Sequence, residues 1–275
     1  MIPLADTRAD AEFEHLFQAI FERYHYDFRR YAEASLRRRV ASALVHFSCD
    51  DVPRLEQRAL SDPRVFTELL RFLTVQVSDL FRDPAYFRAL RDEVVPVLRT
   101  YPSPKVWVAG CATGEEAYSL AILLAEEGLL ERTQIYATDI HPESLRIAQA
   151  GVYSIDRFAR FSENYLQAGG RASLSQYYTA EYSSAVLDRS LKKAILFADH
   201  SLATDSVFAE MQLVSCRNVL IYFERALQDR ALGVISDALC RKGFLGLGLK
   251  ETLRFSIHAS EFREFVPDAR IYQRL

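Results

Sequence analysis

The sequence predicts an α/β domain built on a parallel sheet and preceded by an all-helical domain. An apolar run at 106–109 leads through Gly110 and Gly114 into an apolar-periodic segment, which is typical of a buried strand, a tight turn and a helix. A second short strand is expected at 134–138, and it ends in Asp139. The first third of the chain shows helical periodicity without strand-like alternation.

The composition is ordinary for a globular protein: 275 residues, 49% apolar, 26% charged, with a net charge of −3. This length can bury one large core or two modest ones. The charge balance gives no reason to expect nucleic-acid binding, and the longest apolar run, 120–125, is too short to span a bilayer. The four cysteines lack metal-ligand spacing. We therefore expect a cytoplasmic protein with free thiols, no metal ion and no membrane insertion.

One-sided apolar patterns and Asp-Pro start signals predict helices at 11–21, 31–45, 64–74 and about 85–99. Polar residues alternate through the segment that precedes the last of these helices. We assign 1–84 to a helical N-terminal domain with its linker, and 85–275 to the α/β domain.

Basic residues are concentrated between Arg23 and Arg39, where six arginines face two acids. A solvated helix face is the plain interpretation of such a run. The functional interpretation is a docking surface for an acidic partner, with Arg37, Arg38 and Arg39 as the partner-binding candidates. RNA is a third interpretation, because aromatic residues interleave the run.

Two glutamates, Glu115 and Glu116, follow the glycine turn. Glycine lets the backbone approach a ligand, so Gly110 is expected to line one. Two carboxylates would repel a pyrophosphate, which disfavours a nicotinamide cofactor, whereas they would attract an amine or a sulfonium. Asp139 can accept hydrogen bonds from ribose hydroxyls. These features favour S-adenosyl-L-methionine, but a plain strand–turn–helix capped by Thr113 explains the turn equally well.

The chain from about 153 to 193 breaks the strand–helix alternation, and we interpret it as an insertion that carries specificity or acts as a lid. Further strands are predicted at 194–197, 211–216, 244–248 and 271–275, with helices at 142–150 and 225–241. Ligand groups cluster at the carboxyl ends of strands in such sheets. Arg217, Asn218 and Tyr222 follow one of these strands and are therefore site candidates.

Four stretches together resemble one family: 110–119, 137–140, 247–252 and the unusual string Cys216-Arg-Asn-Val-Leu-Ile-Tyr-Phe223. The chain resembles the CheR-type chemoreceptor methyltransferases, which methylate receptor glutamates using S-adenosyl-L-methionine. The resemblance covers nearly the whole chain. It implies a Rossmann-like class I methyltransferase domain with a small inserted β-subdomain at 153–193, behind an all-helical N-terminal domain.

The resemblance also implies roles for single residues. The cofactor-binding positions it implies are Gln76, Ser78, Arg82, Gly110, Glu115, Asp139, Ser201, Leu202, Arg217 and Asn218. Glu115 and Asp139 would hold the cofactor's amino-acid end and ribose, and Tyr222 would lie near the transferring methyl. The implied partners are chemoreceptor cytoplasmic helices and, at the insertion, a receptor C-terminal peptide. The implied product is S-adenosyl-L-homocysteine.

The sequence departs from the family pattern at several positions. Gln76 and Ser201 stand where asparagine is usual, and Ser78 stands where threonine is usual. These changes alter reach or remove an amide, so cofactor contacts there are expected to be weaker or water-mediated. Leu249-Lys250 replaces a common histidine–serine pair, which indicates a divergent branch.

Methyl transfer to a glutamate requires alignment rather than a general base, because the carboxylate is already ionised at neutral pH. An arginine can orient a carboxylate with two parallel hydrogen bonds. Arg217 or Arg99, together with Tyr222, are the catalytic candidates. Two other functions stay open: an S-adenosyl-L-methionine-dependent methyltransferase acting on RNA or a small molecule, and a non-catalytic cofactor-binding scaffold. The retained site residues argue against the scaffold.

Overall fold

The computed structural model describes residues 7–275, which form two compact units. Among these residues, one unit comprises 7–75 and 222–228, and the other comprises 76–221 and 229–275. The division falls after Val75, earlier than the boundary that we predicted at 84/85. The reason is that the linker packs onto the second unit: Phe81 N–H donates to Ser119 Oγ at 2.8 Å, and Asn164 donates to the Leu80 carbonyl at 3.0 Å.

The helical unit contains α1 (Thr7–Tyr24), α2 (Glu33–His46), α3 (Val52–Ser61) and α4 (Pro63–Leu73). Asp51 caps α3 by accepting from Arg54 N–H at 2.9 Å, and Asp62 caps α4 by accepting from Arg64 N–H at 2.9 Å. The apolar stripes of the helices form one small core, and its fully buried members include Leu16, Ile20, Leu36, Leu55 and Leu69. The sequence analysis had not predicted α3, whose buried face is only Leu55 and Ala59.

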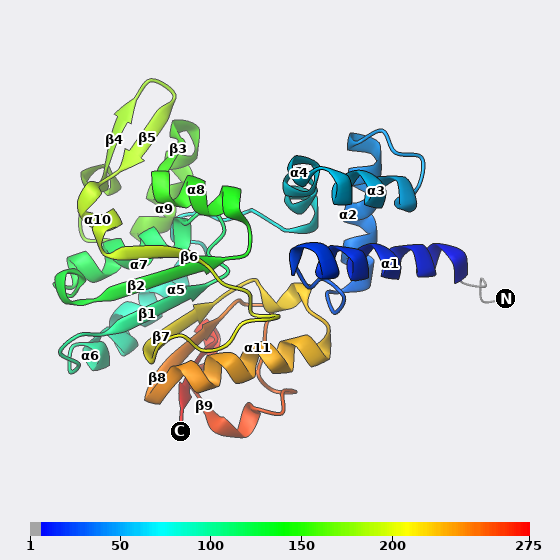
Figure 1. Cartoon of the computed structure of the whole chain (residues 1–275). Coiled ribbons are helices and arrows are strands. Elements are labelled where there is room, and N and C mark those ends of the chain that lie inside the picture. The colour runs from blue at the N-terminus through cyan, green and yellow to red at the C-terminus, as the bar shows by residue number, and fades with distance from the viewer. Residues whose placement is uncertain (1–6) are drawn as a thin grey trace. The chain divides into compact units, whose positions relative to one another are not determined.

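The second unit is built on a seven-stranded sheet of order β6-β2-β1-β7-β8-β10-β9 (Figure 1). Its strands are β1 (Lys105–Ala109), β2 (Gln134–Asp139), β6 (Ile195–Asp199), β7 (Met211–Cys216), β8 (Leu239–Leu247), β9 (Phe262–Val266) and β10 (Ile271–Arg274). The first five strands in this order pair in parallel, whereas β10 pairs antiparallel with both β8 and β9. The carboxyl ends of β1, β2, β7 and β8 therefore lie at the same edge of the sheet.

The helices of this unit are α5 (Pro84–Ala89), α6 (Val95–Leu98), α7 (Glu115–Glu126) and α8 (Pro142–Ala150), and α11 (Arg225–Ala238) continues into it from the helical unit. A π-helical turn at Leu90–Val94 interrupts the helix predicted at 85–99. The helix predicted at 225–241 ends at Ala238, because the chain from Leu239 pairs with β7 as part of β8. Strand pairing thus overrides the local helical pattern at its end.

The predicted insertion is a small lobe containing β3 (Val152–Ser154), α9 (Phe158–Gln167), β4 (Tyr178–Glu181), β5 (Ser184–Leu187) and α10 (Arg189–Lys193). Its three strands form a separate antiparallel sheet of order β3-β5-β4, which Figure 1 shows beyond the β6 edge of the main sheet. The hydroxyls of Tyr165 and Tyr177 both donate to Glu126 at the end of α7, and Arg91 forms an ion pair with the same carboxylate at 2.7 Å. These contacts join the lobe to the main core.

Within residues 7–275, none of the helices combines the length and the apolar character needed to cross a membrane. The same part of the chain holds no group of three or more His, Cys, Asp or Glu side chains placed to bind a metal ion.

Candidate functional site

The turn after β1 is tightly constrained. Gly110 and Gly114 have positive φ angles of +74° and +93°, and Ala112 has one of +47°. The Thr138 carbonyl on β2 accepts the N–H groups of Gly110 at 2.8 Å and Cys111 at 2.9 Å. A Cβ atom on Gly110 would lie 2.5 Å from a methyl of Val219. Only glycine fits here without strain, and the backbone is thereby brought to the carboxyl edge of the sheet.

Asp139 lies at the end of β2 and contacts the glycine turn. Its side chain is buried, with Oδ2 accepting Ala112 N–H at 2.8 Å and Oδ1 accepting His141 N–H at 2.9 Å. Burial raises the pKa of Asp139, and the two backbone donors partly oppose that shift. Each carboxylate oxygen has a second lone pair. Asp139 can therefore fix the glycine turn and still accept hydrogen bonds from ribose hydroxyls.

Glu115 begins α7 and is fully buried. Oε2 accepts the Thr113 hydroxyl at 2.7 Å, and Arg157 Nη1 lies 2.8 Å from Oε1. Burial raises the pKa of Glu115, while Thr113 and Arg157 act in the opposite direction. Arg157 also donates to the Ser78 carbonyl in the linker. Glu115 is thus the point where α7, the inserted lobe and the linker meet.

Arg157 was missed by the sequence analysis, since it lies in the insertion, outside any motif that resembles the family. Tyr153 was also missed as a site residue, and its hydroxyl donates to the Thr113 carbonyl at 2.7 Å. Both residues support the start of α7 from the lobe. Their contacts could not be predicted from spacing in the sequence, because only the folded chain brings Arg157 to Glu115 and Tyr153 to Thr113.

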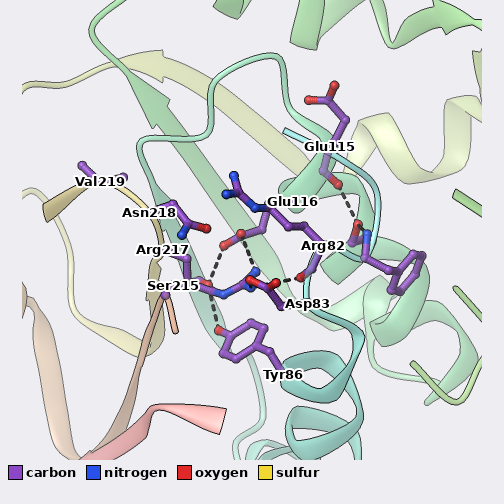
Figure 2. Close-up of polar contacts among 12 residues, drawn as sticks. Arg82, Asp83, Tyr86, Glu115, Glu116, Ser215, Arg217, Asn218 and Val219 are labelled. Atoms are coloured by element: carbon purple, nitrogen blue, oxygen red, sulfur yellow. Dashed lines mark hydrogen bonds and ion pairs between the residues drawn. The ribbon is translucent and has the colours of Figure 1, made fainter. Parts of the chain in front are cut away.

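Glu116, the second glutamate of the turn, contacts the end of β7 instead (Figure 2). Glu116 accepts the Ser215 hydroxyl at 2.6 Å and Arg217 Nη1 at 2.9 Å. Arg217 Nη2 reaches Asp83 at 2.8 Å and the Arg82 carbonyl at 3.0 Å. The guanidinium carbon lies 4.1 Å from the centroid of the Tyr86 ring.

These contacts occupy Arg217 inside the protein, where its side chain is 1% exposed. We had expected Arg217 to orient a substrate carboxylate or to line the cofactor. The structure instead places it in a buried ionic cluster that joins the end of β7, the first turn of α7 and the linker. Its expected contact with a substrate is therefore not supported by this arrangement.

The other linker positions lie close to the same edge. The Gln76 side chain hydrogen-bonds the Ser144 hydroxyl on α8, and Arg82 donates to the Val77 carbonyl at 3.3 Å. After β6, Ser201 N–H donates to Asp205 at 2.9 Å and Leu202 is buried. The structure thus brings the linker together with Glu115 through Arg157, and it places Ser201 and Leu202 in the loop after β6, beside β2.

Asn218 follows β7 with a φ of +60°, and its N–H donates to Glu251 at 2.9 Å. The Glu251 carboxylate also accepts the N–H groups of Val219 at 2.9 Å, Ile221 at 3.3 Å and Gly248 at 2.6 Å. It is buried, which raises its pKa, while the backbone donors oppose that shift. Glu251 lies in the stretch 247–252 that resembles the family, but the sequence had not indicated this role.

Arg99 is not brought to this site. It forms an ion pair with Glu127 at 2.6 Å, just beyond the carboxyl end of α7. The site lies at the amino end of that helix, about 18 Å away for 12 residues at 1.5 Å each. Arg99 instead belongs to the network that includes Arg91.

Tyr222 and the three basic candidates belong to the helical unit. Arg39 donates to the Leu73 carbonyl at 2.6 Å, and its guanidinium lies 4.8 Å from the Tyr222 ring centroid. Arg37 pairs with Asp10 at 2.5 Å, whereas the Arg38 side chain is exposed. The roles of all four stay predictions.

The buried carboxylates suit a cationic nucleoside ligand. Glu115 can balance an ammonium group and Asp139 can accept from ribose hydroxyls, as S-adenosyl-L-methionine requires. Two family models match this chain: CheR methyltransferase, SAM binding domain, over residues 76–266, and CheR methyltransferase, all-alpha domain, over residues 11–74. The chain belongs to the CheR methyltransferase family. The predicted family, fold class and cofactor, S-adenosyl-L-methionine, are thereby confirmed.

Curated relatives are similar to this chain over most of its length. The chain is 55% identical over 270 residues to "Putative methyltransferase Cher3" of Pseudomonas putida, covering 98% of this chain and 99% of that protein. It is 29% identical over 234 residues to "Chemotaxis protein methyltransferase" of Listeria innocua, covering 82% and 84%. Among solved structures, the N-methyltransferase NodS of Bradyrhizobium japonicum WM9 in complex with S-adenosyl-L-homocysteine aligns with a TM-score of 0.38 at 12% identity, covering 72% of this chain and 87% of that one. That likeness is too low to carry an argument.

Proposed function

We propose that this CheR-family methyltransferase transfers a methyl group to glutamate side chains of chemoreceptor cytoplasmic helices in the cytoplasm, forming glutamyl methyl esters in chemosensory adaptation. The observation that carries the proposal is the convergence of Glu115 and Asp139 on one glycine turn in a chain that matches both CheR domains. The names of curated relatives in Listeria and Vibrio, which are chemotaxis protein methyltransferases, support the substrate class.

The methyl transfer does not require a general base from the protein. S-adenosyl-L-methionine supplies, when bound, a methyl group activated by a positively charged sulfur. A substrate glutamate has a reference pKa of about 4.3, so its carboxylate can attack as it stands at neutral pH. A carbon–oxygen bond forms as the carbon–sulfur bond breaks, which neutralises one cation and one anion.

The residues of this chain therefore act by binding the cofactor and by aligning it with the substrate carboxylate. Glu115 and Asp139 hold the two ends of the nucleoside, and the Gly110 turn allows close backbone approach. We assign Tyr222 to the path of the methyl group on the family resemblance. Arg217 contributes by holding the linker against α7, through Asp83 and Glu116.

The test uses the full chain, methyl-labelled S-adenosyl-L-methionine and purified chemoreceptor cytoplasmic fragments. We expect label on the receptor that is released as methanol by mild base, and none on receptors whose methylation-site glutamates are changed to alanine. Label in RNA or in a small-molecule fraction would favour another methyltransferase, and cofactor binding without any transfer would favour a scaffold.

We also propose that the inserted lobe captures a receptor C-terminal peptide. β4 is an edge strand of the lobe's sheet, and its residues Thr179–Glu181 are exposed. An edge strand offers unpaired N–H and C=O groups to an added strand. Receptor fragments with and without their last residues should then differ in affinity for the chain, and equal affinity would exclude this capture.

A further inference from the structure

A nine-residue segment after β8, Leu249 to Ile257, combines exposed apolar and basic side chains. Phe255 is 65% exposed, Ile257 is 75% exposed and Leu249 is 50% exposed. Single exposed apolar residues are common on protein surfaces, whereas several exposed apolar residues close together are typical of interaction surfaces. The segment also carries Lys250 and Arg254, both exposed.

The backbone of this segment is firmly anchored. Glu251 and Leu253 are buried, and the Glu251 carboxylate accepts the N–H of Gly248 at the root of the segment. Ser256 Oγ donates to Asp229 on α11 at 2.7 Å, and Ser256 N–H donates to the Leu253 carbonyl at 2.8 Å. Because Glu251, Leu253 and Ser256 are anchored, the side chains between and beside them are held toward solvent.

The charge of the segment has one sign. Glu251 is its only acidic residue, and that carboxylate is buried on backbone donors. The Arg254 guanidinium lies 5.7 Å from the centroid of the exposed Phe255 ring, so a cation and an apolar surface are presented side by side. Such a surface complements an acidic helix with an apolar flank.

The position of the segment connects it to the cofactor site. β8 runs parallel to β7, so the segment leaves the sheet at the same edge as the glycine turn and Asp139. A Cβ atom on Gly248 would lie 2.9 Å from the Asn218 backbone nitrogen. Glu251 hydrogen-bonds both Gly248 and Asn218, which joins the root of the segment to the chain after β7.

We propose that the segment 249–257 is a docking surface for the glutamate-bearing helix that accepts the methyl group. Lys250 and Arg254 attract its carboxylates, while Phe255 and Ile257 contact its apolar flank. The inference rests on the proposed function and names which surface recognises that substrate. Leu249-Lys250, at the start of this segment, is also where the chain departs from the family pattern.

The experiment compares two double variants of the full chain, Lys250→Glu with Arg254→Glu, and Phe255→Ser with Ile257→Ser. The matched control is Leu196→Ser on β6, which is 51% exposed and lies outside both the segment and the inserted lobe. Methyl transfer to chemoreceptor cytoplasmic fragments is measured, with binding of a fluorescent fragment by anisotropy. We expect KM and the fragment's Kd to rise at least fivefold in both double variants, whereas the affinity for S-adenosyl-L-methionine stays unchanged. Leu196→Ser should keep the wild-type KM and Kd.

The outcomes separate the two proposals. If the wild-type chain methylates the fragments and both double variants keep its KM and Kd, the docking surface is excluded while the proposed function stands. If the wild-type chain neither binds nor methylates the fragments, the proposed function fails and the docking surface fails with it. A rise in KM for the control equal to that of the double variants would also overturn the assignment of this segment.

Discussion

The carboxylate of Glu251 accepts the backbone N–H of Asn218 at 2.9 Å. Asn218 has a φ of +60°, a conformation that most residues avoid and that surrounding contacts must hold. The same carboxylate accepts the N–H of Gly248, so the chain after β7 and the chain after β8 are fixed to one side chain. The geometry of the Asn218 position therefore depends on a buried carboxylate thirty-three residues away in sequence.

Replacing Glu251 with Gln should destabilise the protein and weaken cofactor binding. The amide would point N–H groups at backbone donors, leaving buried N–H groups without acceptors at a cost of about 1–3 kcal/mol. Urea unfolding and calorimetric titration with S-adenosyl-L-methionine measure the two effects. Glu264→Gln on β9 serves as the exposed control, and Glu251→Gln that behaves like this control would show that the carboxylate is dispensable.

Asp139→Ala should sharply weaken S-adenosyl-L-methionine binding, whereas Tyr222→Phe should spare binding and slow turnover. Hydrogen bonds to a charged group contribute about 1.5–3 kcal/mol each, so loss of the ribose contacts predicts at least a tenfold rise in Kd. Asp139→Asn checks whether lost anchoring of Ala112 and His141 contributes to the change. Normal cofactor affinity in Asp139→Ala would count against the ribose assignment.

Arg217→Met should lower the free energy of unfolding by about 3–5 kcal/mol, because it leaves Glu116 and Asp83 without their buried cation. Adding Glu116→Gln to Arg217→Met should recover part of this loss, since one uncompensated charge is removed. Denaturant titration of the single and double variants measures the coupling. Strictly additive losses would mean that the two side chains do not act as a pair.

Substitutions of Arg38 and Arg39, both on α2, should have different effects. Arg38 is exposed, so Arg38→Glu should raise KM for receptor and leave cofactor affinity and stability unchanged. Arg39 binds the Leu73 carbonyl and lies over the Tyr222 ring, so Arg39→Glu should also lower the melting temperature and kcat. Steady-state kinetics and thermal melting together distinguish the two variants. An unchanged KM in Arg38→Glu would return this part of the basic run to a solvated helix face.

Cofactor affinity should fall as the pH is lowered through the range in which Glu115 and Asp139 take up protons. Burial raises the pKa of both Glu115 and Asp139, so each takes up a proton at a higher pH than in an unfolded chain. A raised pKa in the folded state means that protonation of these carboxyls increases the free energy of unfolding at low pH. This stabilising contribution is lost as the pH rises through the raised pKa. Binding needs the ionised carboxylates and therefore follows the opposite direction.

This prediction is measured by calorimetry in buffers of different ionisation enthalpy. At a pH where these carboxyls are partly protonated, binding should release protons, because the bound cation stabilises the ionised carboxylates. Asp139→Asn removes one titrating group and should release fewer protons. A Kd that stays constant as the pH is lowered to the point where the protein begins to unfold would contradict the role of these carboxylates.

The strand–turn–helix around Gly110 could be predicted because its signals are local. Two glycines, a run of β-favouring residues and an apolar helical period lie within 17 residues of sequence, from Val106 to Ile122. The end of α11 could not be predicted in the same way. Its pattern continues as helical to Arg241, and only pairing with β7 turns that stretch into β8.

At the site, too, the sequence predicts only part of what the two adjacent glutamates do. Their presence after a glycine turn indicated a cationic ligand, and Glu115 is buried at the start of α7 as that interpretation requires. The sequence could not show that Glu116 faces Arg217 instead, since neighbouring residues on a helix point in different directions. Nor could it show that Arg157 reaches Glu115 from the inserted lobe.

The sequence alone determined the family, the order of domains, the cofactor class and the residues that mark the carboxyl edge of the sheet, because each depends on short motifs. Tertiary structure decided which charged groups are committed to one another: Arg217 to Glu116 and Asp83, and Glu251 to the chain after β7. Buried charges need partners at hydrogen-bond distance, and those partners come from segments that only the folded chain brings together.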